Sequence, residues 1–175
     1  MDKIKDAVDR AAFLEAMRCA VSSVTVVTTD GPAGRAGLTI SAMCSLSADP
    51  PAVLVCINRL SPVLGIIQAN GNFCVNLLGL EHRKVADVFA GRIPALRNDR
   101  FACAQWERGA TGAPALVDAL TALDCELVSH TSFASHEVLI GRVVDLRMRH
   151  QDPLIYVDRS YYGVGLRVDT EGATQ

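Results

Sequence analysis

Hydroxyl-bearing side chains alternate with apolar ones in the stretch GLTISAMCSLSADPP, residues 37–51. Even positions are apolar, whereas Thr39, Ser41, Ser45 and Ser47 stand at odd positions. A period of two predicts an extended strand with one apolar face. The opposite face carries no charge, although a face open to water normally does. We therefore expect this face to be covered, either by another protein layer or by a flat ligand that lies close to the backbone.

A second polar group, Asn58, Arg59 and Ser61, stands between an apolar strand and a predicted helix. Ser61 suits the N-cap and Pro62 the first helical position. The start of a helix presents unpaired amides and the positive end of its dipole, which together attract anions. Arg59 would add a charge-assisted contact to a bound phosphate. The plainer alternative is that Ser61 only caps the helix and Arg59 is a solvated surface charge.

His136 and the segment DRSYYG are the remaining candidates. His136 opens a long predicted strand, where an imidazole can donate to a ligand or sit near a proton transfer. It can equally be a partly exposed turn residue. Arg159, Tyr161 and Tyr162 stand together in DRSYYG, a grouping that also suits a sheet edge. No Ser-His-Asp or Cys-His arrangement is indicated by the histidine positions.

Strands outnumber helices in the hydrophobic pattern. The strands open in hairpins, no GxGxxG follows a strand, and a doubly wound nucleotide fold is therefore disfavoured. The pattern predicts a mainly β fold, an antiparallel barrel with helices packed outside. The expected helices are 4–21, 62–70 and 81–91, and the expected strands are 22–30, 37–48, 52–58, 72–78, 119–133, 136–148 and one or two within 153–164.

Composition narrows the class of protein. A length of 175 residues, half of them hydrophobic, suits one domain over residues 1–175. The net charge of −2 and the lack of a basic stripe predict no nucleic-acid partner. Apolar runs are too short to span a membrane, and the charged N-terminal stretch differs from a secretory signal. Six cysteines without CxxC spacing predict buried, reduced thiols, no metal site and a cytoplasmic location.

Several motifs, in order, resemble the flavin reductase-like domain family. They are VSSVTVVTTDGPAGRAGLTISAMCSLSADPPAVLVCINRLS, NFCVNLL, VADVFAGR, RFACAQWERGATGAPAL, HEVLIGRVVDL and PLIYVDRSYYG. The resemblance covers about residues 10–163. It implies an FMN-binding split β-barrel of Greek-key type and a homodimer. It also implies an enzyme that uses NADH or NADPH to reduce FMN or FAD, and that supplies reduced flavin to a separate monooxygenase acting on aromatic compounds.

The resemblance also implies roles for individual residues. The strand and turn that meet the isoalloxazine edge match Thr39, Ser41, Cys44 and Ser45. Ile40 and Ala42 stand where the family commonly has Asn and Phe. The segment that holds the ribityl phosphate end matches Asn58, Arg59 and Ser61.

On the nicotinamide side of the flavin, the family's histidine matches His136. Arg159 and Tyr161 match a C-terminal basic and aromatic pair near the cofactor, with either Tyr161 or Tyr162 facing it. Hydride transfer between cofactors needs no strong acid or base from the protein. Two other functions stay open: a non-catalytic flavin carrier or storage protein, and a related split-barrel flavin oxidase such as one acting on pyridoxamine phosphate.

Overall fold

A computed structural model describes residues 7–165 of the chain. Its helices, 3₁₀ turns and strands are α1 (Arg10–Arg18), β1 (Ser22–Ser23), β2 (Thr25–Thr29), β3 (Ala36–Ile40), β4 (Met43–Ala48), β5 (Pro51–Asn58), α2 (Pro62–Asn70), β6 (Asn72–Leu77), η1 (Leu80–His82), α3 (Arg83–Phe89), η2 (Pro94–Leu96), η3 (Arg100–Cys103), β7 (Trp106–Arg108), β8 (Pro114–Leu116), β9 (Thr121–Phe133), β10 (His136–Met148), β11 (Leu154–Val157) and β12 (Ser160–Gly163). The fold is mainly β with a few helices, as predicted.

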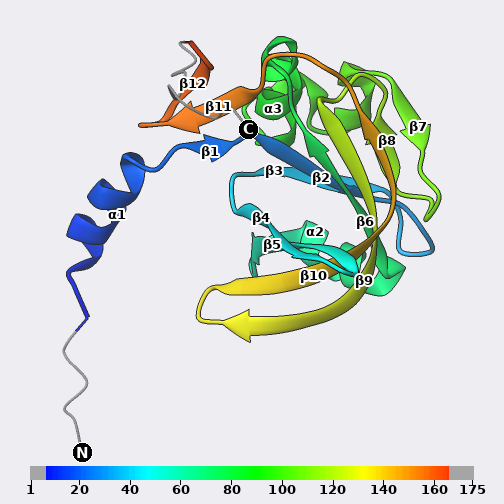
Figure 1. Ribbon diagram of the computed structural model, residues 1–175, viewed down its shortest axis with the longest axis horizontal. Helices are drawn as coiled ribbons and strands as arrows, with labels where there is room; N and C mark the ends of the chain where they lie inside the picture. Colours follow the sequence, from blue (N-terminus) through cyan, green and yellow to red (C-terminus); the bar gives the residue numbers. More distant parts are fainter. Residues whose placement is uncertain (1–6, 166–175) are drawn as a thin grey trace, which may run out of the picture.

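Seven strands form the main sheet, in the order β3-β2-β6-β9-β10-β5-β4, and every neighbouring pair is antiparallel. Its two edge strands, β3 and β4, follow one another in the sequence and are joined by only Ser41 and Ala42. Three Cα–Cα steps span about 11 Å at most. The sheet must therefore curl until its edges nearly meet, as Figure 1 shows, although β3 and β4 do not pair with each other.

The prediction of one strand over residues 37–48 was wrong, because the chain breaks there into β3 and β4. The connecting pair, Ser41 and Ala42, continues the polar and apolar alternation, so the pattern carries no sign of the break. The two halves lie at opposite edges of the sheet. Residues 44–48 are exposed in the described chain.

Both faces of the sheet carry a hydrophobic core. Five consecutive residues of β2 are buried, which requires cover on both sides. Val26 packs with the residues of α3 and β8, whereas Val27 packs with those of α2 and β5. Alternate side chains of one strand thus join two separate cores.

The helices begin and end where local chemistry indicates. α2 follows Ser61, has Pro62 at its first turn and ends at Gly71, whose φ is 70°. Ser61 makes no side-chain capping bond. α1 is shorter than the expected 4–21, of which residues 4–6 lie outside the described residues. Its N-cap is Asp9, whose carboxylate accepts from two backbone amides.

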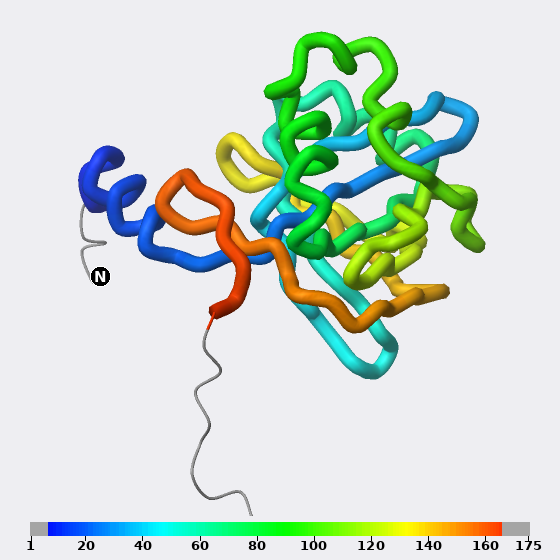
Figure 2. The backbone as a smooth tube through the Cα atoms, turned by 90° about the horizontal axis from the view of Figure 1, so that it is seen from above, coloured from blue at the N-terminus to red at the C-terminus, as the bar shows by residue number. Residues whose placement is uncertain are grey.

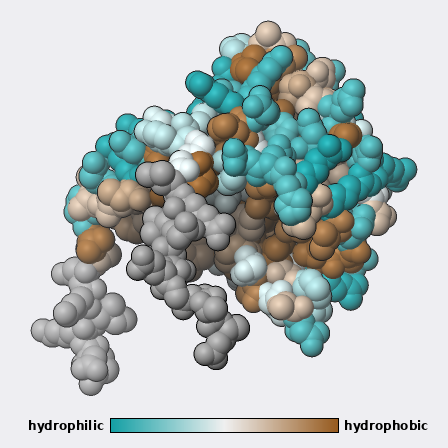
Figure 3. All heavy atoms as spheres, turned by 45° about the horizontal axis from the view of Figure 1, so that its top comes forward, coloured by the Kyte–Doolittle hydropathy of each residue, from teal (hydrophilic) through white to brown (hydrophobic). Residues whose placement is uncertain are grey.

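An arm projects from the main sheet. It consists of α1, β1 and the β11–β12 hairpin, and β1 pairs with β11. Figure 2 shows α1 beside the turn of this hairpin, at one side of the body. No residue of α1 is buried in the described chain. Figure 3 shows hydrophobic atoms in the recess where this arm meets the body.

The prediction that the cysteines are buried holds for only some of them. Cys74 and Cys125 are buried, but Cys19 and Cys44 are exposed, and none of the six forms a disulfide in residues 7–165. Burial raises the pKa of the Cys125 thiol to about 12.

Within residues 7–165, no helix combines the length and apolar character needed to cross a bilayer.

Gly141 in β10 gives a test of the core packing. A Cβ there would meet the ring of Phe73 and lie 2.9 Å from the Cβ of Cys125. Gly141→Ala should therefore lower the free energy of unfolding by about 1–3 kcal/mol, the range for overpacking. The measurement is urea denaturation.

Gly65→Ala is the matched control, because a Cβ at Gly65, inside α2, meets nothing within 4 Å. It should stabilise the protein by about 0.5–1 kcal/mol, the helix preference of Ala over Gly. Equal stability of the two variants would contradict the close contact between β6 and β10.

Candidate functional site

A cavity of about 360 Å³, called here the ring pocket, opens where β3 passes into β4. The strand ends of β3 and β5, the mouth of β10, the loop after α3 and the β11–β12 hairpin supply its walls. Its lining residues are Val24, Leu38, Thr39, Ile40, Ser41, Ala42, Cys56, Ile57, Asn58, Ala90, Arg92, His136, Tyr156 and Tyr161. The near-closure of the sheet therefore brings these segments, and Val24 before β2, to one place.

The structure gathers half of the residues that the sequence singled out. Those that line the ring pocket are Thr39, Ser41, Asn58, His136 and Tyr161. Those that lie outside its lining are Cys44, Ser45, Arg59, Ser61 and Arg159. Tyr161 rather than Tyr162 faces this cavity, and Tyr162 is half exposed.

Thr39 fixes the edge strand to a helix. Its hydroxyl donates to the Ala86 carbonyl in α3, at 2.8 Å. This bond uses the hydroxyl hydrogen, so Thr39 can only accept from a ligand. Ser41 stands exposed in the connection to β4. The polar face predicted for this stretch is thus divided between packing on α3 and the wall of the ring pocket.

Asn58 and His136 are paired across β5 and β10 at the mouth of the pocket. The Asn58 side chain accepts from the Leu60 amide at 2.9 Å, which turns the chain toward α2. His136 is exposed, and its Nδ1 lies 3.0 Å from the Ser135 hydroxyl. Among residues 7–165, Nε2 of His136 has no hydrogen-bond partner, so it is available to a ligand in the pocket.

Arg59 is held at the β9–β10 turn rather than in the ring pocket. Its backbone amide donates to the Ser135 carbonyl at 3.0 Å, and its guanidinium donates to the Ala134 carbonyl at 3.4 Å. Ala134 has a φ of 49°, so this turn is strained. Arg59 thus braces the turn that presents His136.

Glu137 braces the same hairpin from the other face of β10. It is buried, and its carboxylate accepts hydrogen bonds from Ser132 and from His130, the latter at 2.6 Å. The bond from Ser132, followed by that from His130, lowers the pKa of Glu137. The carboxylate is thereby kept ionised one residue from His136.

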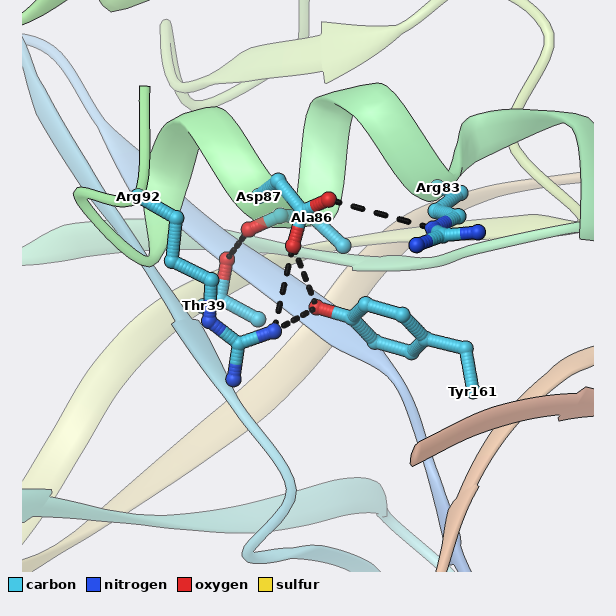
Figure 4. A network of polar contacts seen from close by, with 6 residues as sticks. All are labelled: Thr39, Arg83, Ala86, Asp87, Arg92 and Tyr161. Carbon is cyan, nitrogen blue, oxygen red and sulfur yellow. Dashed lines mark hydrogen bonds and ion pairs between the residues drawn. The ribbon is translucent and has the colours of Figure 1, made fainter. Parts of the chain in front are cut away.

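A polar network closes the opposite wall (Figure 4). Asp87 in α3 accepts from Arg92 at 3.1 Å and from the Tyr161 hydroxyl at 3.2 Å. Arg92 also donates to the Tyr161 oxygen at 3.1 Å. Burial, followed by the charge of Asp87, raises the pKa of Tyr161. The phenol therefore stays protonated and fixes the hairpin to α3.

Sequence reasoning missed Arg92 and Tyr156. Arg92 directly follows Gly91, which has a φ of 75° and stands just after α3. Arg92 itself lines the ring pocket. The glycine that stops the helix was the available signal. Tyr156 packs against Tyr161 with ring centroids 5.4 Å apart, and no local pattern distinguishes it from a strand aromatic.

A further cavity of about 420 Å³ lies at the start of α2. Arg35, Arg97 and Arg100 line it, together with Pro62 and Gly37. We call it the α2 pocket. The Arg100 guanidinium donates to the Gly37 carbonyl at 3.3 Å, and Arg35 lies 3.9 Å from the centre of a neighbouring phenylalanine ring. Asp99 also lines the α2 pocket, so the three arginines leave a formal charge of +2 beside the N-terminus of α2.

The α2 pocket and the ring pocket are linked by β3. Residues 35–37 line the α2 pocket, and the next three residues line the ring pocket. Within residues 7–165, no cluster of metal-ligating side chains is found. β3 thus has a mainly apolar cavity along one part of its length and an arginine-lined cavity along the next.

Comparison with known proteins assigns this arrangement to a family. The family model described as flavin reductase like domain matches residues 17–165. A protein named FMN reductase (NADH) RutF 1, from Methylorubrum extorquens, is 48% identical over 155 residues, which are 88% of this chain and 76% of that protein.

Two solved structures extend the likeness. The flavin reductase PheA2 is 30% identical, with a TM-score of 0.82, over 91% of this chain and 100% of that one. The styrene monooxygenase flavin reductase from Pseudomonas putida is 25% identical, with a TM-score of 0.79, over 89% and 99%. The chain belongs to the flavin reductase like domain family.

Proposed function

We propose that this protein is an NADH-dependent flavin reductase that reduces FMN and passes the reduced flavin to a separate oxygenase. The observation that carries the proposal is the ring pocket between the two edges of the sheet, in a chain of this family. A relative of this chain is named FMN reductase (NADH). A similar structure is the flavin reductase of a styrene monooxygenase.

The ring pocket fits a flat aromatic group. Leu38, Ile40 and Ile57 offer apolar surface, Tyr156 offers an aromatic face, and Ser41 offers a polar edge. Bound FMN would supply the hydride-accepting chemistry, which no side chain of the protein has. The contribution of the chain is to hold the isoalloxazine ring of FMN against the nicotinamide ring of NADH and to exclude water. Proximity and orientation of this kind lower barriers by about 7 kcal/mol or more in favourable cases.

The α2 pocket fits the phosphate of FMN. A ligand that follows β3 from Thr39 to Ala36 travels about 10 Å, at 3.3–3.4 Å per residue. It would then reach Arg97 and the N-terminus of α2, where a phosphate meets both positive charge and the helix dipole. Ser61 leaves these amides without a side-chain cap. The proposed phosphate site therefore differs from the one expected at Asn58, Arg59 and Ser61, because none of these three residues lines the α2 pocket.

His136 serves the nicotinamide side of the site. It stands at the mouth of the ring pocket, on a hairpin braced by Arg59 and Glu137. Its role is to orient the nicotinamide, and hydride transfer requires no proton from it. Cys44 and Ser45 lie on β4, outside the lining of the ring pocket. Any contact of this stretch with the flavin would therefore come from backbone groups near Ser41.

The curled, open sheet is interpreted as a split β-barrel of Greek-key type, and two copies are inferred to pair. β9 and β10 expose four large apolar side chains, those of Val128, Val144, Leu146 and Met148. Apolar side chains left exposed on neighbouring strands are the basis for inferring an interface here. The occupant we infer is a second copy of the chain, as the family resemblance implies. A cytoplasmic location stays a prediction from composition.

The flavin carrier is the principal alternative function, and an NADH oxidation assay separates it from the reductase. On flavin-free protein with FMN, FAD and riboflavin in parallel, we expect turnover with FMN. A carrier would oxidise no NADH. An oxidase of pyridoxamine phosphate would turn over that amine without NADH.

His136→Ala should raise the KM for NADH about two- to tenfold, which corresponds to a lost hydrogen bond of about 0.5–1.5 kcal/mol. The dissociation constant of FMN should change less. Both are measured on the same preparation, by steady-state kinetics and by flavin fluorescence. If the dissociation constant of FMN rises more than the KM for NADH, His136 contacts the flavin rather than the nicotinamide.

Arg97→Ala should weaken FMN binding about five- to tenfold, or about 1–1.4 kcal/mol. Riboflavin, which lacks the phosphate, should bind the variant and the parent equally. Arg59→Ala is the comparison, since Arg59 is bound to the β9–β10 turn. If Arg59→Ala weakens FMN binding and Arg97→Ala does not, the phosphate lies on the Arg59 side of the helix start.

Leu146→Glu should raise the dissociation constant of the homodimer at least about tenfold, or about 1.4 kcal/mol, because a carboxylate would be buried in an apolar interface. Sedimentation equilibrium measures it. Ala95→Glu adds the same charge at an exposed position outside this face and should leave the dimer intact. A monomeric parent protein would refute the interface.

A further inference from the structure

We propose that a cavity of about 510 Å³ beside the ring pocket binds the pyrophosphate of the nicotinamide dinucleotide. The inference rests on the proposed function and names the site that its hydride donor would use. This cavity, called here the arginine pocket, is lined by Arg83, Asp87, Arg92, Ile93, Arg159, Ser160 and Tyr161.

Three guanidinium groups reach the arginine pocket from different parts of the chain. Arg83 begins α3, Arg92 follows α3, and Arg159 belongs to the turn between β11 and β12. Asp87 is the one acidic group among the lining residues, so the lining carries a formal charge of +2, whereas the whole chain carries −2. This lining charge favours an anionic ligand.

The single carboxylate leaves most of the guanidinium donors unused. Asp87 is engaged by Arg92 at 3.1 Å and lies 3.9 Å from the Nε of Arg83. The Arg83 side chain is 74% exposed. Among residues 7–165, Arg159 has no ion pair. Five N–H donors per guanidinium allow bidentate contacts to phosphate oxygens.

Arg159 stands in a backbone conformation that disfavours its side chain. The hairpin turn has two central residues, Asp158 and Arg159, with φ of 44° and 61°. Such a turn favours Asn followed by Gly, since both residues need positive φ. An arginine where glycine fits best is a strained choice, and strain of this kind gathers at ligand sites. The Asp158 amide also donates to the Arg18 carbonyl at 3.0 Å, which anchors the turn to α1.

The arginine pocket and the ring pocket share a wall. Arg92 and Tyr161 line both cavities. A ligand with a ring in one cavity and an anionic group in the other must pass these two side chains. The flavin phosphate is assigned to the α2 pocket, which belongs to β3 and α2. The reaction brings together two anionic ligands, and the second cationic cavity is left for the nicotinamide dinucleotide.

The decisive variant is Arg159→Gly, because glycine suits the turn and only the guanidinium is lost. We expect the KM for NADH to rise about five- to tenfold, while kcat and the dissociation constant of FMN stay within about twofold. Arg159→Lys, which keeps the charge, should recover part of the loss. Arg149→Ala removes an exposed charge outside both pockets and should leave all three constants unchanged.

Substrate and inhibitor arms identify the group that is bound. Reduced nicotinamide mononucleotide lacks the pyrophosphate link, so Arg159→Gly should change its KM less than that for NADH. Inorganic pyrophosphate should compete with NADH in the parent protein and more weakly in Arg159→Gly.

Two results would overturn the inference while leaving the reductase intact. One is an unchanged KM for NADH in both Arg159→Gly and Arg83→Ala. The other is a loss of FMN binding, but not of riboflavin binding, in these variants, which would assign the arginine pocket to the flavin phosphate. If the parent protein oxidises no NADH, the proposed function fails. Equilibrium binding of NAD⁺ to the parent and to Arg159→Gly then decides the inference by itself.

Discussion

The short connection between β3 and β4 is the constraint on which the site depends. Two residues join the opposite edges of a seven-stranded sheet, so the end of β3 and the start of β4 lie within about 11 Å of each other. The sheet has to curl, and the curl places the ends of β3, β5 and β10 around one cavity. Helices then fill the two faces, α2 on one side and α3 on the other.

The polar contacts around the cavity divide it into parts with different tasks. The Thr39 bond to α3 fixes the edge strand, and the contacts of Arg59 and Glu137 fix the hairpin with His136. The network of Asp87, Arg92 and Tyr161 binds the β11–β12 hairpin to the body. These groups hold surfaces in place rather than exchange protons, which agrees with a reaction whose chemistry belongs to bound cofactors.

Local signals were enough to predict some of this structure. Ser61, Pro62 and Gly71 mark both ends of α2 because helix ends depend on local backbone preferences, although the Ser61 side chain makes no capping bond. The break at Ser41 and Ala42 was hidden, since alternation continues through it. Convergence of residues far apart in the chain, such as Arg92 with Tyr161, depends on tertiary packing and has no local signature. The family resemblance supplied the cofactor and the reaction, but it did not place Arg92 or Tyr156.

The open edge of β3 has a consequence for the protein in the absence of its ligands. An edge strand presents a row of backbone groups that no neighbouring strand pairs, and such rows template aggregation. In β3 the Gly37 carbonyl is covered by Arg100, but the sheet still ends there. A bound flavin would lie along this same edge and occupy it. Flavin binding would then also oppose aggregation through this edge. Storage with FMN would therefore protect the protein against aggregation as well as fill its flavin site.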